Sequence, residues 1–155
     1  MFTLIKPVVD LCIVCSDFER SLEFYRDQLG LDVVLDIDIP EQTAVGAGLA
    51  PTGFRQVRLQ AGQTLIKLME IENPPPAPPA GFHAGVRWLT LIIDDVPAAV
   101  EQLTAVGVEF VSPPVTAPDA AAVVCARDPD GVLIELVQLR PEDLVEMTPP
   151  AEESS

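Results

Sequence analysis

An internal duplication constrains this chain more than any other feature of its sequence. Asp10 begins an apolar run that leads to Asp17, and Trp88 begins one that leads to Asp95 after the same seven-residue step. The two halves then close on similar runs, Leu65-Ile66-Lys67-Leu68 in the first and Leu133-Ile134-Glu135-Leu136 in the second. A repeat of this kind predicts two copies of one structural module.

A proline-rich segment separates the two copies. Residues 72–81, with the sequence ENPPPAPPAG, hold five of the sixteen prolines. Proline has no backbone N–H and a fixed φ, so neither a helix nor a sheet ladder can persist there. We predict a single domain over residues 1–140, built from module one (7–72), a stiff linker (73–85) and module two (86–140). The acidic tail, 141–155, is expected to be largely mobile.

Local patterns predict the same order of elements in both modules: one strand, one helix and three further strands. Ser16 and Glu19 have the spacing of a capping box before the first helix, and Asp95 with Pro97 suits the first turn of the second. The predicted strands lie near residues 7–14, 31–38, 53–60, 64–72, 86–93, 107–112, 121–127 and 132–139. We therefore expect an α+β protein made of two tandem βαβββ modules.

The charge of the chain limits its partners. Twenty-four acidic residues against nine basic ones give a net charge of −15 at pH 7. Nucleic acids and anionic membranes attract Lys and Arg, so we expect neither as a partner and favour a small molecule. No apolar run approaches the roughly 18 residues of a membrane helix, and the N-terminal residues lack the pattern of a signal peptide. We expect a cytoplasmic protein.

The cysteines fit a reducing compartment. The count is odd, and Cys12 and Cys15 point to opposite faces of one predicted strand, so they cannot pair with each other. Cys12 and Cys125 have apolar neighbours and are expected to be buried, unreactive thiols. Tyr25 lies on the apolar stripe of the first helix and is expected in the core. The single histidine, His83, lies beside the linker and is expected to be a surface or hinge residue.

The two βαβββ modules resemble those of the vicinal oxygen chelate superfamily. That group includes glyoxalase I, methylmalonyl-CoA epimerase, extradiol dioxygenases, fosfomycin-resistance enzymes and bleomycin-binding resistance proteins. The specific motifs are SDFERSLEFY at residues 16–25 and DPDGVLIEL at residues 128–136, and the resemblance covers about residues 7–140. It implies curved mixed sheets that form a cup. It leaves the reaction open, because this fold hosts many chemistries and pure binding.

The resemblance identifies four candidate site positions. In metal-dependent members, the ligands come from the first and last strand of each module, which correspond here to Asp10, Lys67, Trp88 and Glu135. Only Glu135 has the usual residue; histidine is usual at positions 10 and 88, and glutamate at position 67. An ammonium has no lone pair to give a metal, and an indole has no acceptor. We therefore predict a site without a metal ion or any other cofactor.

We predict that Lys67 takes the place of the metal, with its ammonium between the carboxylates of Asp10 and Glu135. Beside a bound carbonyl group, a carboxyl with a perturbed pKa in this cluster would transfer a proton, so these three residues are the candidate catalytic residues. The alternative is that Lys67 extends to the rim and Glu135 caps a backbone amide. The cluster would then have no chemical role.

Six residues are candidates for substrate binding: Trp88, Arg58, Arg87, Thr90, Cys12 and Met69. Gln56 is a further possible lining residue by strand parity. Trp88 is either a surface on which a ligand stacks or a core aromatic. Arg55, Arg58 and Arg87 either clamp a substrate carboxylate or enolate or pair with surface acids.

Two functions of different classes follow. Our main hypothesis is a metal-independent isomerase, epimerase or lyase that acts on a small carbonyl-containing molecule. Asp10 or Glu135 would move a proton, and Lys67 with an arginine would stabilise the oxyanion. The alternative is a non-catalytic protein that sequesters a cationic or aromatic antibiotic, as bleomycin-resistance proteins do, with Trp88 as the stacking surface. The resemblance also suggests a homodimer.

Overall fold

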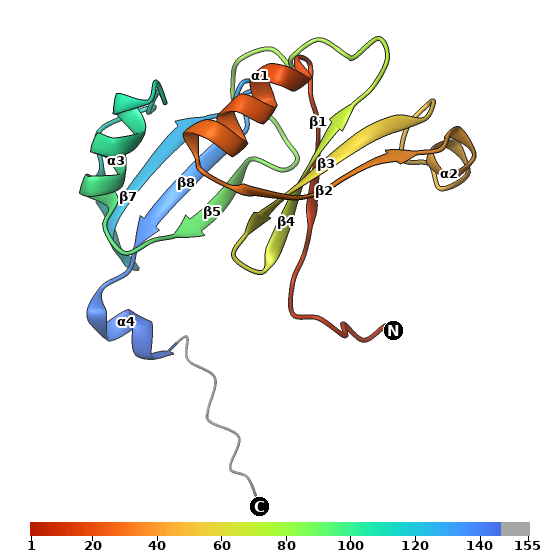
Figure 1. Cartoon of the computed structure of the whole chain (residues 1–155). Helices are drawn as coiled ribbons and strands as arrows, with labels where there is room; N and C mark the ends of the chain where they lie inside the picture. Colours follow the sequence, from red (N-terminus) through yellow and green to blue (C-terminus); the bar gives the residue numbers. More distant parts are fainter. Residues whose placement is uncertain (147–155) are drawn as a thin grey trace, which may run out of the picture. The chain divides into compact units, whose positions relative to one another are not determined.

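The computed structural model describes residues 1–146, which divide into two compact units. The first unit comprises residues 1–80 together with the turn 129–131, and the second comprises residues 81–128 and the chain from 132 onward. Each unit holds one four-stranded sheet (Figure 1). No helix among the described residues is both long enough and apolar enough to span a membrane.

The first unit contains one βαβββ module with an additional short helix. Its elements are β1 (Leu11–Val14), α1 (Phe18–Leu22), the π-helical η1 (Glu23–Gln28), β2 (Asp32–Ile39), α2 (Glu41–Gly46), β3 (Phe54–Ala61) and β4 (Thr64–Glu70). The sheet has the order β1-β4-β3-β2. β1 runs parallel to β4, and the other pairs are antiparallel.

The second unit repeats this arrangement. Its elements are β5 (Trp88–Ile92), α3 (Val96–Ala105), β6 (Val115–Ala117), β7 (Ala120–Arg127), β8 (Leu133–Gln138) and α4 (Pro141–Glu146). The sheet has the order β5-β8-β7-β6, again with one parallel pair, β5 and β8. The predicted α+β class and the two βαβββ modules are therefore confirmed.

One face of each sheet packs against the helix of its own module. Leu59 and Leu68 are completely buried in the first unit, as is Tyr25 from η1, which confirms its predicted place in the core. Ile134 and Leu136, which correspond to Ile66 and Leu68 of the first module, are buried in the second unit. Because side chains alternate along a strand, the neighbouring residues project from the other face of each sheet, which we call its open face.

The residues of each open face follow from the strand register. In the first sheet, Cys12, Lys67 and Arg58 lie side by side on β1, β4 and β3. In the second sheet, Thr90 and Glu135 are register partners on β5 and β8, and Cys125 lies beside Glu135 on β7. These two rows contain most of the side chains that the sequence suggested as site residues.

Two boundaries differ from the sequence predictions. Residues 107–112 do not form a strand; only one isolated bridge joins Phe110 to Ala126, and the edge strand β6 begins later. Pro113 and Pro114 interrupt the chain between the two places, which explains the displacement. The helix α4 occupies the first residues of the predicted mobile tail, and residues 147–155 lie outside the described part.

The short helix α2 was not predicted, and it changes the open face of the first sheet. Ala44 from α2 packs into a small buried cluster with Phe54, Met69 and Ile71. Met69, a predicted substrate-binding residue, is 4% exposed and therefore lies in a core cluster under this helix. The segment around α2 thus covers one end of the face.

The start of the first helix uses a different cap from the predicted one. The carboxylate of Asp17 accepts the backbone N–H of Arg20 at 3.1 Å, as Asp95 accepts that of Ala98 at 2.9 Å in the second module. The capping box of Ser16 with Glu19 is wrong. The Ser16 hydroxyl and its backbone N–H donate instead to Asp130, with the N–H at 3.2 Å from Oδ1.

Asp130 is a buried carboxylate in the first unit. It is 7% exposed and also accepts the hydroxyl of Ser21 at 3.4 Å. It comes from the turn between β7 and β8, more than one hundred residues away along the chain. A carboxylate withdrawn from water needs such donors, and Ser16 and Ser21 provide them.

Candidate functional site

The open face of the first sheet brings together two of the three predicted catalytic residues. Asp10 lies just before β1, and Lys67 lies in the middle of β4. The Lys67 Nζ is 3.3 Å from the Asp10 Oδ2. The other oxygen of Asp10, Oδ1, accepts the backbone N–H of Leu65 at 3.0 Å. Both oxygens of this carboxylate are therefore engaged.

These contacts decide the protonation state of Asp10. The Leu65 N–H, followed by the hydrogen bond and the positive charge of Lys67 and the charge of Arg58, holds the pKa of Asp10 below its ordinary value, although partial desolvation acts in the opposite direction. Asp10 is consequently ionised at neutral pH and is a weaker base than a free aspartate. Its geometry suits a partner for Lys67 better than a proton acceptor.

Arg58 lies beside Lys67 on the same open face. Its Nε donates to the Oε1 of Gln56 at 2.8 Å, and Gln56 is 8% exposed. Within residues 1–146, no ion pair joins the Arg58 guanidinium to a carboxylate, although the chain has many more acids than bases. Of the three arginines considered from the sequence, this one is best placed to meet a ligand.

The other two arginines have different roles. Arg55 projects from the helix-covered face, where its guanidinium bonds Asp36 and Glu70 at 2.9 Å and lies over the ring of Phe18. It is one of the surface pairs that the sequence left open. Arg87 donates to the carbonyl of Gly81 at 2.8 Å and lies over the ring of Phe82, beside the proline-rich segment.

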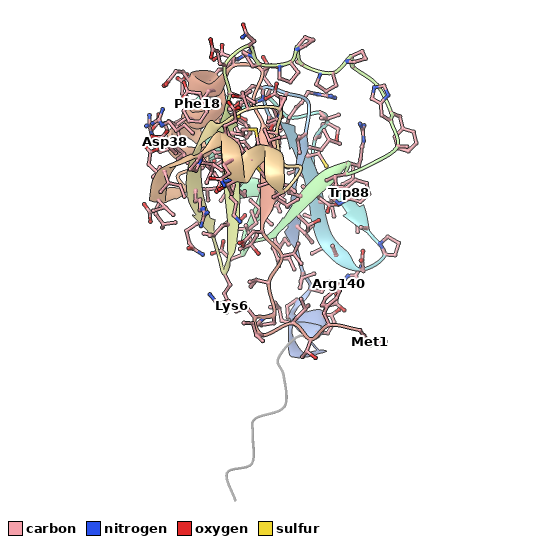
Figure 2. All side chains as sticks on the ribbon, turned by 90° about the vertical axis from the view of Figure 1, so that its right-hand side faces the viewer. Met1, Lys6, Phe18, Asp38, Trp88 and Arg140 are labelled. Carbon is pink, nitrogen blue, oxygen red and sulfur yellow. The ribbon has the colours of Figure 1, made fainter. Side chains whose placement is uncertain are left out.

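The second sheet presents a different group of side chains. The hydroxyl of Thr90 donates to the Oε2 of Glu135 at 2.5 Å across β5 and β8. Trp88 lies on β5 and is 52% exposed, so it is not a core aromatic (Figure 2). Of the two alternatives for this residue, the exposed indole fits a stacking surface. Glu135 belongs to the second unit, whereas Asp10 and Lys67 belong to the first.

The cysteines differ from expectation in one respect. Cys12 is exposed on the open face beside Lys67, contrary to the predicted burial, while Cys125 is half-buried beside Glu135. Desolvation raises the pKa of both thiols above the ordinary value; the charge of Lys67 opposes the effect at Cys12, and the charge of Glu135 adds to it at Cys125. Neither thiol is an activated nucleophile. His83 is exposed beside the proline-rich segment, as predicted.

The four positions that carry ligands in metal-dependent vicinal oxygen chelate proteins do not fit a metal ion here. Lys67 contributes a positive charge that is paired with Asp10, and Trp88 has no electron pair to donate. Among the described residues, no three side chains of the types His, Cys, Asp and Glu are placed to hold a metal ion.

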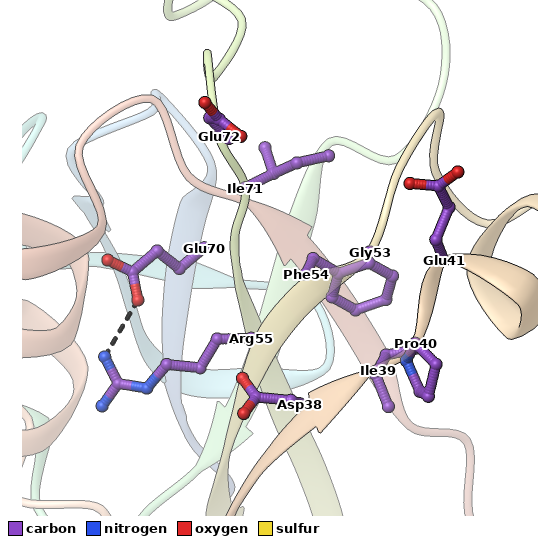
Figure 3. A pocket seen from close by; sticks show the side chains of 10 residues that line it. All are labelled: Asp38, Ile39, Pro40, Glu41, Gly53, Phe54, Arg55, Glu70, Ile71 and Glu72. Atoms are coloured by element: carbon purple, nitrogen blue, oxygen red, sulfur yellow. Dashed lines mark hydrogen bonds and ion pairs between the residues drawn. The ribbon is translucent and has the colours of Figure 1, made fainter.

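A pocket that the sequence did not predict lies at the ends of β2, β3 and β4 (Figure 3). Its volume is about 580 Å³, and its lining combines Phe54 and Ile71 with the carboxylates of Asp38, Glu41 and Glu72. Gly53 allows the chain to close here, because a Cβ at this residue would lie 3.0 Å from the carbonyl of Ile39. The available sequence signal was the pair of acids, Asp38 and Glu41, on either side of Pro40.

Comparisons with known proteins agree with the fold. The model of the Glyoxalase/Bleomycin resistance protein/Dioxygenase superfamily matches residues 5–136. The uncharacterized protein YaeR of Escherichia coli (strain K12) is 27% identical over 134 residues, which cover 86% of this chain and 97% of that protein.

Solved structures give the same result. A glyoxalase family protein from Bacillus cereus superposes with a TM-score of 0.69 at 20% identity and covers 89% of this chain and 96% of its own, which shows a shared fold. TnmS3, an antibiotic binding protein from Streptomyces sp. CB03234, superposes with a TM-score of 0.64 at 25% identity and covers 90% of this chain and 100% of its own.

Proposed function

The chain belongs to the Glyoxalase/Bleomycin resistance protein/Dioxygenase superfamily, and we propose that it binds an aromatic small molecule of the antibiotic type without a metal ion. The observation that carries this proposal is the exposure of Trp88 on the open face of the second sheet. A half-exposed indole is costly to leave in water and offers a flat, polarisable surface on which an aromatic ring can stack.

Two further observations favour binding over proton transfer. Asp10 has both oxygens engaged and a lowered pKa, which makes it a poor proton acceptor. TnmS3, which is similar to this chain over its whole length, is described as an antibiotic binding protein. Non-catalytic binding of a cationic or aromatic antibiotic was the alternative predicted from the sequence, and these two observations support it over proton transfer.

The fluorescence of Trp88 provides the test. It is the only tryptophan of the chain, so intrinsic emission reports on this side chain alone. Titration with bleomycin and with a planar anthraquinone is expected to give saturable quenching. In calorimetry, Trp88→Ala should weaken binding at least about tenfold, whereas Trp88→Phe should retain part of the affinity because it keeps a ring.

Phe82→Ala is the matched control. Phe82 is also an exposed aromatic of the second unit, but it lies beside the proline-rich segment under Arg87. Its removal should leave the affinity unchanged. The proposal is wrong if neither probe quenches Trp88, or if Phe82→Ala and Trp88→Ala weaken binding equally.

Metal independence has its own test. Dialysis against EDTA should leave the affinity unchanged, because Lys67 and Trp88 replace two electron-pair donors of the metal-dependent relatives. Re-addition of Zn²⁺, Ni²⁺ or Mn²⁺ should likewise change nothing. Loss of binding in EDTA that is restored by one of these ions would contradict this part of the proposal.

A second candidate function, the isomerase, epimerase or lyase of a carbonyl compound, is favoured by one contact. The hydroxyl of Thr90 fixes one oxygen of Glu135 at 2.5 Å and thereby orients the carboxylate on an open face. In this candidate Glu135 accepts the proton from the carbon next to the carbonyl group.

Proton exchange tests this candidate without knowledge of the product. The chain is incubated in D₂O with small 2-oxo acids and hydroxyketones, and loss of the α-proton signal is followed by NMR. Glu135→Gln should abolish enzyme-dependent exchange while leaving quenching of Trp88 intact. Exchange at the buffer rate with the unmodified protein would remove the candidate.

We also propose that the chain forms a homodimer. Val14 and Leu35 are exposed on the open face of the first sheet, and Ile92 is exposed on that of the second. Apolar side chains in this position favour burial against a partner. Light scattering after gel filtration should give twice the chain mass of 16.7 kDa, and the mass of one chain would contradict the proposal.

A further inference from the structure

The open face of the first sheet has more hydrogen-bond donors than acceptors. Gln56, Arg58 and Lys67 project from the same side of β3 and β4, because Arg58 is the register partner of Lys67 and Gln56 lies two residues before it. Asp10 is the acidic side chain among them, and both of its oxygens already accept a hydrogen bond or an ion pair. The hydrogen-bonding atoms on this face that remain available to a ligand are therefore N–H donors.

Gln56 contributes to this excess because its amide has only one chemically sensible orientation. The Nε of Arg58 is a donor, so the atom that it bonds at 2.8 Å must be the amide oxygen of Gln56. The amide nitrogen makes no hydrogen bond within the described part of the chain, and it is open to solvent, because no buried side-chain nitrogen or oxygen there lacks a partner. Gln56 is more than nine-tenths buried, so its donor is held in one place.

Arg58 supplies the geometry that selects a ligand. Its Nε is fixed by Gln56, which orients the plane of the guanidinium. The two terminal nitrogens have no carboxylate partner among the described residues, in contrast to Arg55, which binds two carboxylates. A planar fork of this kind matches the two oxygens of a carboxylate or of a phosphate.

Two positive charges lie side by side on this face, although the whole chain has a net charge of −15. Arg58 and Lys67 are register partners, and Asp10 is paired with Lys67. Asp32, a second acid of the face, lies beside Gln60, farther along β3. At physiological salt, charges more than about 8 Å away are largely screened, so the nearby cations dominate the field that a small ligand meets at contact.

We propose that Gln56, Arg58 and Lys67 form an oxyanion-binding site that takes the carboxylate or phosphate group of a small ligand. The Arg58 fork receives two oxygens of that group, and Lys67 and the Gln56 amide nitrogen donate to the remaining ones. The site goes beyond the proposed stacking function, because it requires neither Trp88 nor any other residue of the second unit.

The experiment uses the full chain and two defined probes. Sodium oxalate and inorganic phosphate are titrated separately at constant ionic strength, and binding is followed by calorimetry and by amide shifts of β3 and β4 in NMR spectra. At least one probe should bind saturably below about 10 mM, with shifts centred on Gln56, Arg58 and Lys67. Tighter binding of oxalate would identify a carboxylate ligand, and tighter binding of phosphate would identify a phosphorylated one.

Two substitutions that each remove one positive charge distinguish a specific binding site from nonspecific electrostatic attraction. Arg58→Gln should weaken binding at least about tenfold, because it removes the fork. Arg20→Gln removes the same charge from an exposed position on α1 and should change the affinity less than about twofold. If Arg58→Gln does not fold, Arg58→Lys keeps the charge without the fork and should still weaken binding.

The result that overturns the proposal is equally clear. If neither probe binds saturably, or if Arg58→Gln and Arg20→Gln weaken binding to the same extent, the face is not an oxyanion site. Because Trp88→Ala should leave oxalate and phosphate binding unchanged, the failure of this proposal is distinguishable from the failure of the stacking proposal.

Discussion

The first and second modules have equivalent buried residues but differ in the side chains on their open faces. Leu68 and Leu136 occupy equivalent positions on the last strand of each module, and both are buried on the helix-covered face. One residue earlier, on the open face, Lys67 in the first module corresponds to Glu135 in the second. The residue beside each on the neighbouring antiparallel strand is Arg58 in one case and Cys125 in the other.

This difference shows which positions of the duplicated module are free to diverge. A residue on the packed face must fill a fixed volume, so its replacement is constrained by cavities and strain. A residue on the open face meets solvent or a ligand and can reverse its charge without disturbing the sheet. The duplication therefore supplies two similar scaffolds with different surface chemistry.

The largest expected effect concerns the buried residues that the two modules share. Leu68→Ala and Leu136→Ala should each lower the free energy of unfolding by about 2–5 kcal/mol, because each leaves a cavity in a packed core. Urea unfolding followed by circular dichroism measures the loss, and the emission of Trp88 reports on the second unit. Leu49→Ala, at a position that is 58% exposed, is the control and should have little effect.

These variants also test how far the equivalence of the modules extends. If Leu68→Ala shifts the Trp88 transition as much as Leu136→Ala does, the two modules unfold together. If the urea midpoint reported by Trp88 emission does not change in Leu68→Ala, the modules unfold separately.

The second prediction concerns a contact that only the first module makes. Asp130→Ala removes the acceptor for Ser16 and Ser21 and should lower the free energy of unfolding by about 1–3 kcal/mol. Asp119→Ala removes an exposed aspartate and should cost much less. Equal effects in thermal or urea unfolding would show that the buried carboxylate contributes no more than a surface one.

The third prediction uses pH to examine the Asp10 and Lys67 pair. Because the folded chain holds the pKa of Asp10 below its ordinary value, the contribution of Asp10 to stability is complete above that ordinary value and is lost as the pH falls through the lowered one. Lys67→Gln should raise the pKa of Asp10 and make stability less dependent on pH in the acid range. Carboxyl NMR titration and urea midpoints measure both effects.

Arg20→Gln is again the matched control, since it removes one positive charge that does not contribute to the lowered pKa of Asp10. It should leave the titration of Asp10 unchanged. An unchanged titration in Lys67→Gln as well would mean that the Leu65 N–H and the charge of Arg58 hold the pKa of Asp10 without the ion pair.

The smallest expected effect compares the two thiols. Lys67→Gln should slow alkylation of Cys12 at pH 8, because it removes the charge that favours the thiolate, and Glu135→Gln should accelerate alkylation of Cys125. We expect changes of about two- to threefold in opposite directions, measured by mass spectrometry of the labelled peptides. Changes in the same direction would contradict the assigned electrostatic difference between the modules.

Much of the fold was predictable because the sequence contains two copies of the same module. The repeat located both modules, and strand parity placed Lys67 and Glu135 on equivalent faces. The helix α2 was not predictable because it is only six residues long and follows Pro40 without a polar side-chain cap. The misplaced strand near residue 110 shows the opposite error, in which a short apolar run was favoured over the prolines that follow it.

The candidate site was only partly predictable. The contact between Asp10 and Lys67 was expected from the ligand positions that the resemblance to the vicinal oxygen chelate superfamily implied. The separate roles of Arg55 and Arg58 were available in principle, since two residues three apart on a strand point to opposite faces. The burial of Asp130 beside Ser16 joins segments that lie far apart in the chain, which no local pattern records. Gln56 and Arg58 are neighbours on one face of β3, but the sequence does not say which of their atoms bond.

The π-helical turn of the first module has a consequence for how such a chain can change length. From Asp17 to Gly30 the first module uses one residue more than the second uses from Asp95 to Gly107. The Leu29 N–H bonds the carbonyl of Phe24, five residues back, so η1 accommodates a wider loop of backbone per turn. A single inserted codon can thus be absorbed inside a helix while both ends stay in register with the strands they join.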